Sequence, residues 1–301
     1  MKPRITTVIT DLDNTLYDWM EMWGAAFGAM LSVLVERSGM PQSVIEREAR
    51  SVHQRHRTTE YAFLIQALPC LQRKHPGEDL CEVFGDAIRA FRTARERSLR
   101  LFPSVFETLS GLKSKGCLVV GYTDSRAFYA GYRARKLGLD GLLDHLYSPP
   151  DHDMPADTNV ESIRSQPREA YQFRNTVHRL LPEGEVKPNA KVLADIIEDV
   201  GAAPEQAIYV GDSLTKDIVM AQDAGVTDVF ASYGVVQHRE EYELLRRVSH
   251  WTDAEIEQER KMRTLQRTRA SYTLTEFAGL LDLFEFEPFG EVGGATRTSA
   301  G

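Results

Sequence analysis

The chain has 301 residues, of which 42% are hydrophobic, and 36 Lys and Arg against 44 Asp and Glu give it a formal net charge of −8. This apolar content excludes a wholly disordered chain, and the acidic balance disfavours a protein that wraps a nucleic acid polymer. The length exceeds what one small domain needs and fits a core domain that carries insertions.

The cysteines and the hydropathy of the chain predict a soluble protein of the cytoplasm. Cys70, Cys81 and Cys117 are odd in number and show no CxxC spacing, as expected for free thiols in a reducing compartment. No stretch approaches the roughly 18 apolar residues that a membrane span requires. A strand pattern follows Arg4 directly, so we expect no signal peptide before it.

The chain begins with a strand pattern and then becomes helical. Residues 4–10 are rich in Ile, Val and Thr, which is typical of a buried strand. Residues 18–100 have apolar residues at helical spacing, interrupted by the breakers Gly39, Pro69 and Pro76. We therefore expect residues 18–100 to form an all-α subdomain inserted after the first strand.

A regular alternation of strands and helices follows residue 100. We expect strands at 117–124, 142–148, 207–212 and 226–232, and helices at 105–116, 125–139, 167–181, 188–201 and 215–225. Such alternation predicts βαβ units, and hence a three-layer, Rossmann-like α/β core with a parallel sheet covered on both faces.

Polar residues follow the predicted strands at their carboxyl ends, where open α/β sheets bind ligands. These residues, together with a lysine that opens a helix, are Asp11, Asp13, Thr123, Asp124, Lys187, Asp212 and Asp217. Because like charges held close together raise each other's pKa, a group of carboxylates at this edge needs a neutralising cation.

The four segments that carry these residues resemble the motifs of the haloacid dehalogenase-like hydrolase superfamily. DLDNTLYD fits its DxDxT motif, Thr123 ends the strand of its second motif, Lys187 in VKPN fits its third, and GDSLTKD fits GDSxxxD. The motifs follow in the family's order across roughly residues 5–232. The resemblance implies phosphoryl transfer through an aspartyl-phosphate with Mg²⁺, in the phosphatase branch that carries a helical (C1-type) cap.

The resemblance also implies a catalytic role for each motif residue. Asp11 would be the nucleophile, and Lys187 would pair with it and with the phosphate. Thr123 would donate a hydrogen bond to a phosphoryl oxygen. Asp13 would protonate the leaving oxygen and then activate water, which requires a side chain that is free to carry a proton.

Mg²⁺ would be held by carboxylate and carbonyl oxygens, which hard cations prefer. The candidate ligands are Asp11, the backbone carbonyl of Asp13, and Asp212. Asp217 would hold the metal site in place without binding the ion directly. Asp124, a further candidate for substrate binding, stands where the family often has Asn.

The presence of Asp13 favours cleavage of phosphate esters over dehalogenation, because a halide leaving group needs no proton. We therefore expect a Mg²⁺-dependent phosphatase acting on a small phosphorylated metabolite, such as a nucleoside monophosphate or a sugar phosphate. Two alternatives remain open at this stage: a phosphomutase on the same core, and a binding or regulatory protein that retains the fold without turnover.

The predicted domains follow from the motifs and the helical block. The catalytic core would comprise residues 1–17 and 101–235, with an insertion at 149–186, and the cap would comprise residues 18–100. Residues 236–286 would be a helical extension that offers a site for a protein partner, and the small, polar residues 287–301 would be a disordered tail.

Three other features each allow two interpretations. The basic run at 53–57 is either a substrate-facing surface of the cap or a solvated helix face. Trp19 and Trp23 either stack on a substrate or pack the hinge of the cap. The acidic run at 151–153 is either a second metal site or a loop. In each case we favour the second interpretation.

Overall fold

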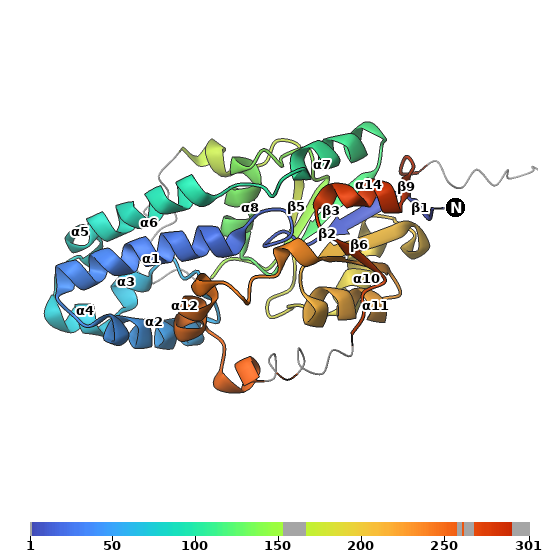
Figure 1. Ribbon diagram of the computed structural model, residues 1–301. Helices are drawn as coiled ribbons and strands as arrows, with labels where there is room; N and C mark the ends of the chain where they lie inside the picture. The colour runs from blue at the N-terminus through green and yellow to red at the C-terminus, as the bar shows by residue number, and fades with distance from the viewer. Residues whose placement is uncertain (1, 153–166, 258–260, 262–267, 291–301) are drawn as a thin grey trace, which may run out of the picture.

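The chain folds into a parallel α/β sheet domain and a helical domain at one end of the sheet, as a computed structural model shows (Figure 1). The structure describes residues 2–152, 167–257, 261 and 268–290. Within these residues a seven-stranded sheet has the order β5-β4-β3-β2-β6-β7-β8, and β1 pairs with β9 beside it. All of these strand pairs are parallel.

The strands are short, as the brief apolar runs of the sequence predict. They are β1 (Arg4–Ile5), β2 (Thr7–Thr10), β3 (Leu118–Tyr122), β4 (His145–Ser148), β5 (Val177–Leu180), β6 (Ala207–Gly211), β7 (Thr227–Ala231), β8 (Tyr272–Leu274) and β9 (Glu285–Phe286).

Helices occupy most of the remaining described residues. The α-helices are α1 (Trp19–Ser38), α2 (Gln42–His56), α3 (Leu64–Ala67), α4 (Pro69–Lys74), α5 (Leu80–Val83), α6 (Gly85–Ser98), α7 (Val105–Ser114), α8 (Ala127–Lys136), α10 (Ala190–Asp199), α11 (Val219–Asp223), α12 (Glu240–Val248) and α14 (Leu280–Leu283). Short 3₁₀ turns lie at η1 (Arg168–Tyr171), η2 (Pro204–Gln206), η4 (Ser232–Gly234) and η5 (Phe277–Gly279), and η3 (Leu214–Ile218) is a π-helical turn.

Apolar side chains alternate between the two faces of the sheet and bury helices on both. On one face Val8 and Val119 pack with Leu109 of α7 and Ala130 of α8. On the other face the neighbouring residues pack against α10 and α11, as Ile9 and Val120 do. The predicted three-layer α/β core with a parallel sheet is therefore confirmed.

Helices α1 to α6 form the helical domain between β2 and α7, with α1 and α6 lying side by side (Figure 1). Asp18 caps the start of α1, where its Oδ1 accepts a hydrogen bond from the amide of Glu21 at 2.8 Å, and Gly39 caps its end in the left-handed conformation. None of the described helices is long and apolar enough to cross a membrane.

Helix α12 lies in the predicted C-terminal extension and packs on α1 and α2 (Figure 1). Its buried residues Tyr242, Leu245 and Val248 belong to the same apolar cluster as Trp23 and Phe27 of α1. Helix α12 therefore adds to the core of the helical domain, and its apolar face is used within the chain.

The structure differs from the sequence predictions at the edges of the sheet. The helix expected at 167–181 is wrong, because this segment holds the short turn η1 and then the edge strand β5. The extension expected to be helical at 236–286 also contributes β8 to the sheet and β9 to the pair with β1. Most of the tail expected to be disordered, 287–301, lies outside the described residues.

Candidate active site

Asp11 follows β2 and lies beside the buried Lys187 at the carboxyl edge of the sheet. The Lys187 Nζ is 2.5 Å from Oδ1 of Asp11 and 3.1 Å from Oδ1 of Asp217. Burial alone would lower the pKa of Lys187, but the two carboxylates raise it well above its usual value. Lys187 is therefore a fixed positive charge between two of the predicted site residues.

The turn after β2 shapes the backbone around Asp11. Asn14 adopts a φ of 61°, a left-handed conformation that Asn tolerates, and its Oδ1 accepts a hydrogen bond from the amide of Met20 at 3.0 Å. Thr15, the threonine of the DxDxT pattern, donates to Oδ2 of Asp11 at 3.2 Å. Together with Lys187, Thr15 orients both carboxylate oxygens of Asp11.

Asp11, Asp212 and Asp217 present carboxylate oxygens within 4.8 Å of one another. Burial raises the pKa of Asp212 well above its usual value, and repulsion from Asp11 and Asp217 raises it further. Burial and repulsion likewise raise the pKa of Asp11, which the attraction of Lys187 only partly offsets. Asp11 and Asp217 are buried and Asp212 is half-buried, and their crowded carboxylates offer the oxygen ligands that a hard divalent cation prefers.

Asp217 is held in place by groups of the GDSxxxD segment and β6. The amide of Ser213 donates to its Oδ2 at 3.1 Å, and the hydroxyl of Tyr209 donates to its Oδ1 at 2.9 Å. The π-helical turn η3 carries Asp217 back toward the strand end. Both oxygens of Asp217 therefore have fixed directions beside Asp11 and Asp212.

The side chain of Asp13 is held by four hydrogen-bond donors. Its Oδ1 accepts from the hydroxyl of Tyr17 at 2.7 Å and from Nη1 of Arg133 at 3.1 Å. Its Oδ2 accepts from the hydroxyls of Ser125 at 2.7 Å and Thr123 at 3.1 Å. The sequence predicts that this side chain is free to carry a proton, whereas in the structure both of its oxygens already accept hydrogen bonds.

Asp124 supports the Lys187 loop. Its Oδ1 accepts from the amide of Lys187 at 3.1 Å, and its Oδ2 lies 3.4 Å from Nζ of Lys216. The Asp124 carboxylate therefore has one cationic partner and one backbone partner at a position where the family often has Asn.

Sequence reasoning missed several partners of the motif residues. Ser125 could have been predicted from the sequence, because it stands only two residues after Thr123 of the second motif. The sequence signal for Arg133 is weaker. Arg133 stands three residues after Ala130 and directly before Ala134, so a charged residue lies on the apolar stripe of α8. Glu60, which pairs with Arg133, lies in a loop of the helical domain and has no sequence signal of its own.

The segment between β7 and α12 closes over the first motif. The hydroxyl of Tyr233 donates to the carbonyl of Thr15 at 2.7 Å. Gly234 packs so closely that a Cβ there would collide with the carbonyl oxygen of Asn14 and would lie 2.8 Å from Cβ of Asp212. Only a glycine fits between these two motif residues at this separation.

One residue of the basic run at 53–57 and both tryptophans of the helical domain pack in its interior. His53 is fully buried, with Nδ1 2.6 Å from the carbonyl of Val248 in α12, and burial lowers its pKa to about 4. His53 therefore does not lie on a solvated face, whereas Arg55 and Arg57 of the same run are exposed, as the solvated-face interpretation predicts. Trp19 and Trp23 stack on each other with ring centroids 5.8 Å apart and pack in the domain core, which agrees with the packing interpretation.

The acidic run after β4 begins as a loop. Asp151 accepts a hydrogen bond from the amide of Phe128 at 2.7 Å, which ties this loop to the first turn of α8. His152 lies against the rings of His56 and Tyr61 in the helical domain. Asp153 lies outside the described residues.

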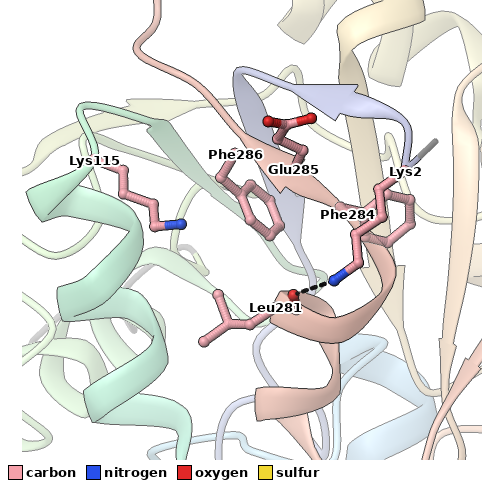
Figure 2. A pocket seen from close by; sticks show the side chains of 6 residues that line it. All are labelled: Lys2, Lys115, Leu281, Phe284, Glu285 and Phe286. Carbon is pink, nitrogen blue, oxygen red and sulfur yellow. Dashed lines mark hydrogen bonds between the residues drawn. The ribbon is translucent and has the colours of Figure 1, made fainter.

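A hollow on the opposite edge of the molecule contains none of the predicted site residues. Figure 2 shows it between α14 and the β1–β9 pair, lined by Lys2, Lys115, Leu281, Phe284, Glu285 and Phe286. Nζ of Lys2 donates there to the carbonyl of Leu281 at 3.1 Å. Because β1 precedes β2, this hollow is at the amino-terminal edge of the sheet, away from Asp11.

Comparison with known proteins finds that the chain is similar to phosphatases. The chain is 24% identical over 287 residues to a glyceraldehyde 3-phosphate phosphatase of Pyrococcus furiosus, covering 94% of this chain and 95% of that protein. It is 23% identical over 246 residues to a glyceraldehyde 3-phosphate phosphatase of Methanopyrus kandleri, covering 78% of this chain and 88% of that protein.

Among solved structures, the 2-haloacid dehalogenase of Pseudomonas syringae pv. tomato shares the fold, with a TM-score of 0.50 and 17% identity over 93% of this chain and 97% of that chain. The model of the haloacid dehalogenase-like hydrolase family matches residues 5–225. On this match and on the fold and motif residues described above, the chain belongs to the haloacid dehalogenase-like hydrolase family.

Proposed function

We propose that the protein is a Mg²⁺-dependent phosphatase that hydrolyses a small phosphomonoester through an aspartyl-phosphate on Asp11. The observation that carries this proposal is the second aspartate: Asp13 lies on the same edge of the sheet as Asp11 and contacts Thr123 of the second motif. An acid–base group beside the nucleophile suits an alkoxide leaving group, which needs a proton, and is superfluous for a halide.

In the first step a carboxylate oxygen of Asp11 attacks phosphorus while the bond from phosphorus to the leaving oxygen breaks. The leaving oxygen takes a proton from Asp13. Lys187 and Thr123 would both contact the phosphoryl oxygens, Lys187 as a fixed charge and Thr123 as a hydroxyl donor. Asp11, Asp212 and Asp217 would hold Mg²⁺, which would offset the negative charge of the phosphoryl group.

In the second step water attacks the phosphorus of the aspartyl-phosphate and gives its proton to Asp13. The bond between phosphorus and Asp11 breaks, which releases phosphate and restores the nucleophile. For Asp13 to serve in both steps, substrate or water must replace one of its hydroxyl partners, and Tyr17, Thr123 and Ser125 can each turn from donor to acceptor.

The relatives support a phosphorylated sugar as the substrate. Two of them are named glyceraldehyde 3-phosphate phosphatase, and their alignments span most of both chains. We therefore place triose and other small sugar phosphates ahead of nucleoside monophosphates as candidate substrates.

The test is release of inorganic phosphate by the purified full chain from a panel of sugar phosphates, nucleoside monophosphates and an aryl phosphate. We expect turnover with Mg²⁺, loss of turnover on addition of EDTA, and a fall of at least about 1,000-fold in Asp11→Asn, which keeps the shape but not the nucleophile. Asp195→Asn, a surface change in α10, is the matched control and should keep full activity. Turnover that survives Asp11→Asn would contradict the assignment of the nucleophile.

A further inference from the structure

Arg133 of α8 is a fully buried arginine that connects the core to the helical domain. Its exposed fraction is 0%, and its two terminal nitrogens contact different carboxylates. Nη1 lies 3.1 Å from Oδ1 of Asp13, and Nη2 pairs with Oε1 of Glu60. A buried guanidinium needs such partners, since an unpaired charge in the interior is costly.

Glu60 belongs to the loop between α2 and α3, which the helical domain holds firmly. The amide of Glu60 donates to Oγ1 of Thr58 at 3.1 Å, and Nε1 of Trp23 donates to the carbonyl of Thr59 at 3.4 Å. Tyr61 stacks on His56 at the end of α2, with ring centroids 3.7 Å apart. The position of the Glu60 carboxylate therefore follows the position of the helical domain.

The planar guanidinium converts these contacts into a fixed geometry. Its nitrogens form a rigid fork, so Asp13 and Glu60 are held at a set separation and direction from each other. Nη1 also donates to the hydroxyl of Ser125 at 3.0 Å, and Ser125 in turn donates to Asp13. The guanidinium carbon lies 5.5 Å from the ring centre of Tyr129 on the same helix, which limits its movement further.

We propose that Arg133 is a positioning residue for Asp13 and that Glu60 sets the position of Arg133. The seating of the helical domain on the core thereby fixes the direction of the acid–base carboxylate. This inference rests on the proposed function, because it assigns Asp13 the transfer of a proton to the leaving oxygen.

Proton transfer to the leaving group gives a readout that a purely structural role would not change. An alkyl phosphate such as glyceraldehyde 3-phosphate needs a proton on its leaving oxygen, whereas 4-nitrophenyl phosphate releases an aryloxide that needs little help. The ratio kcat/KM reports the steps through departure of the leaving group. Misplacing Asp13 should therefore lower kcat/KM for the alkyl phosphate far more than for the aryl phosphate.

The experiment measures kcat/KM for both substrates in the full chain and in Glu60→Gln and Arg133→Lys. General acid catalysis contributes about 100-fold or more, so we expect each variant to lose at least about 10-fold with the alkyl phosphate and less than about 3-fold with the aryl phosphate. Arg133→Lys keeps the charge but not the fork, so a loss in this variant separates geometry from charge.

Glu46→Gln is the matched control. Glu46 is a buried carboxylate of α2 that pairs with Arg247 of α12 at 2.9 Å and has no contact with Asp13. Its substitution should leave the ratio between the two substrates unchanged. Thermal unfolding of every variant shows whether it folds, and Glu60→Gln, which keeps the shape of its side chain, carries the test if Arg133→Lys does not fold.

Equal losses with both substrates in Glu60→Gln, or no loss with either, would overturn the positioning role while leaving the phosphatase proposal intact. A wild-type chain that releases phosphate from neither substrate would overturn the proposed function, and the positioning role with it.

Discussion

At the scale of single residues, the site brings three carboxylates, two of them buried, together with one buried lysine. Asp11, Asp212 and Asp217 approach one another within 4.8 Å, and Lys187 supplies one positive charge between two of them. When all three carboxylates are ionised, the charges do not balance without a further cation. The free energy of unfolding should therefore depend on divalent metal and on the number of carboxylates present.

The variant Asp212→Asn tests this dependence. Without metal it should raise the free energy of unfolding, since it removes one member of a group of carboxylates that repel one another. Added Mg²⁺ should raise the unfolding temperature of the wild-type chain and have little effect on the variant. Differential scanning fluorimetry with and without Mg²⁺ measures both. Equal stabilisation of the two proteins by Mg²⁺ would contradict a metal site at Asp212.

The sequence predicted the motif residues of this site but not the neighbours that restrain them. Asp11, Asp212 and Asp217 stand at fixed offsets from strand ends, and that offset is visible in the sequence. Arg133 of α8 contacts both Asp13 and Glu60, which lie far from it in the sequence, and no local sequence pattern encodes contacts over such separations in the chain.

At the scale of the elements, helix α12 and helix α1 approach closely at a glycine. Gly24 of α1 faces Glu241 of α12, and a Cβ at Gly24 would collide with Cγ of Glu241 and would lie 2.7 Å from its Cβ. The C-terminal extension therefore packs on the helical domain at a distance that only glycine permits.

The pair of variants Gly24→Ala and Gly28→Ala tests this packing. Gly24→Ala should lower the free energy of unfolding by about 1–3 kcal/mol, because the added methyl group forces α12 outward. Gly28 lies on the same helix with nothing within 4 Å of its would-be Cβ, so Gly28→Ala should instead stabilise by about 0.5–1 kcal/mol. Urea unfolding measures both, and Glu241→Gly should partly restore Gly24→Ala. Stabilisation by both alanines would rule out close packing at Gly24.

The strands that the sequence failed to predict all lie at edges. The central strands β2, β3 and β6 are rich in apolar residues because both of their faces are buried. Strand β5 reads VHRL, with no fully buried residue, and it forms because it pairs with β4. Strands β8 and β9 have at most three residues each, which is too short for a recognisable strand pattern. They form because they pair with β7 and β1.

At the scale of the whole molecule, one apolar cluster spans the helical domain and α12, and two others line the faces of the sheet. Between them, the segment from Tyr233 to α12 contacts the turn after Asp11, and Arg239 pairs with both oxygens of Asp18 at 2.8 and 2.7 Å. The start of α1 is therefore tied to the chain that leaves the sheet. The helical domain has contacts to the core beyond its two covalent connections, and these contacts surround the first motif.

The most direct test of the phosphatase account is to trap the phosphorylated enzyme. In Asp13→Asn, 4-nitrophenyl phosphate with Mg²⁺ should still phosphorylate Asp11, because its leaving group needs little protonation, but the intermediate should persist because no base activates water. Mass spectrometry of the intact chain and its peptides should then find one phosphoryl group on the peptide that contains Asp11. Its absence from the double variant Asp11→Asn, Asp13→Asn would support Asp11 as the acceptor. A phosphoryl group on another residue, or release of phosphate with no phosphorylated chain under these conditions, would contradict the account.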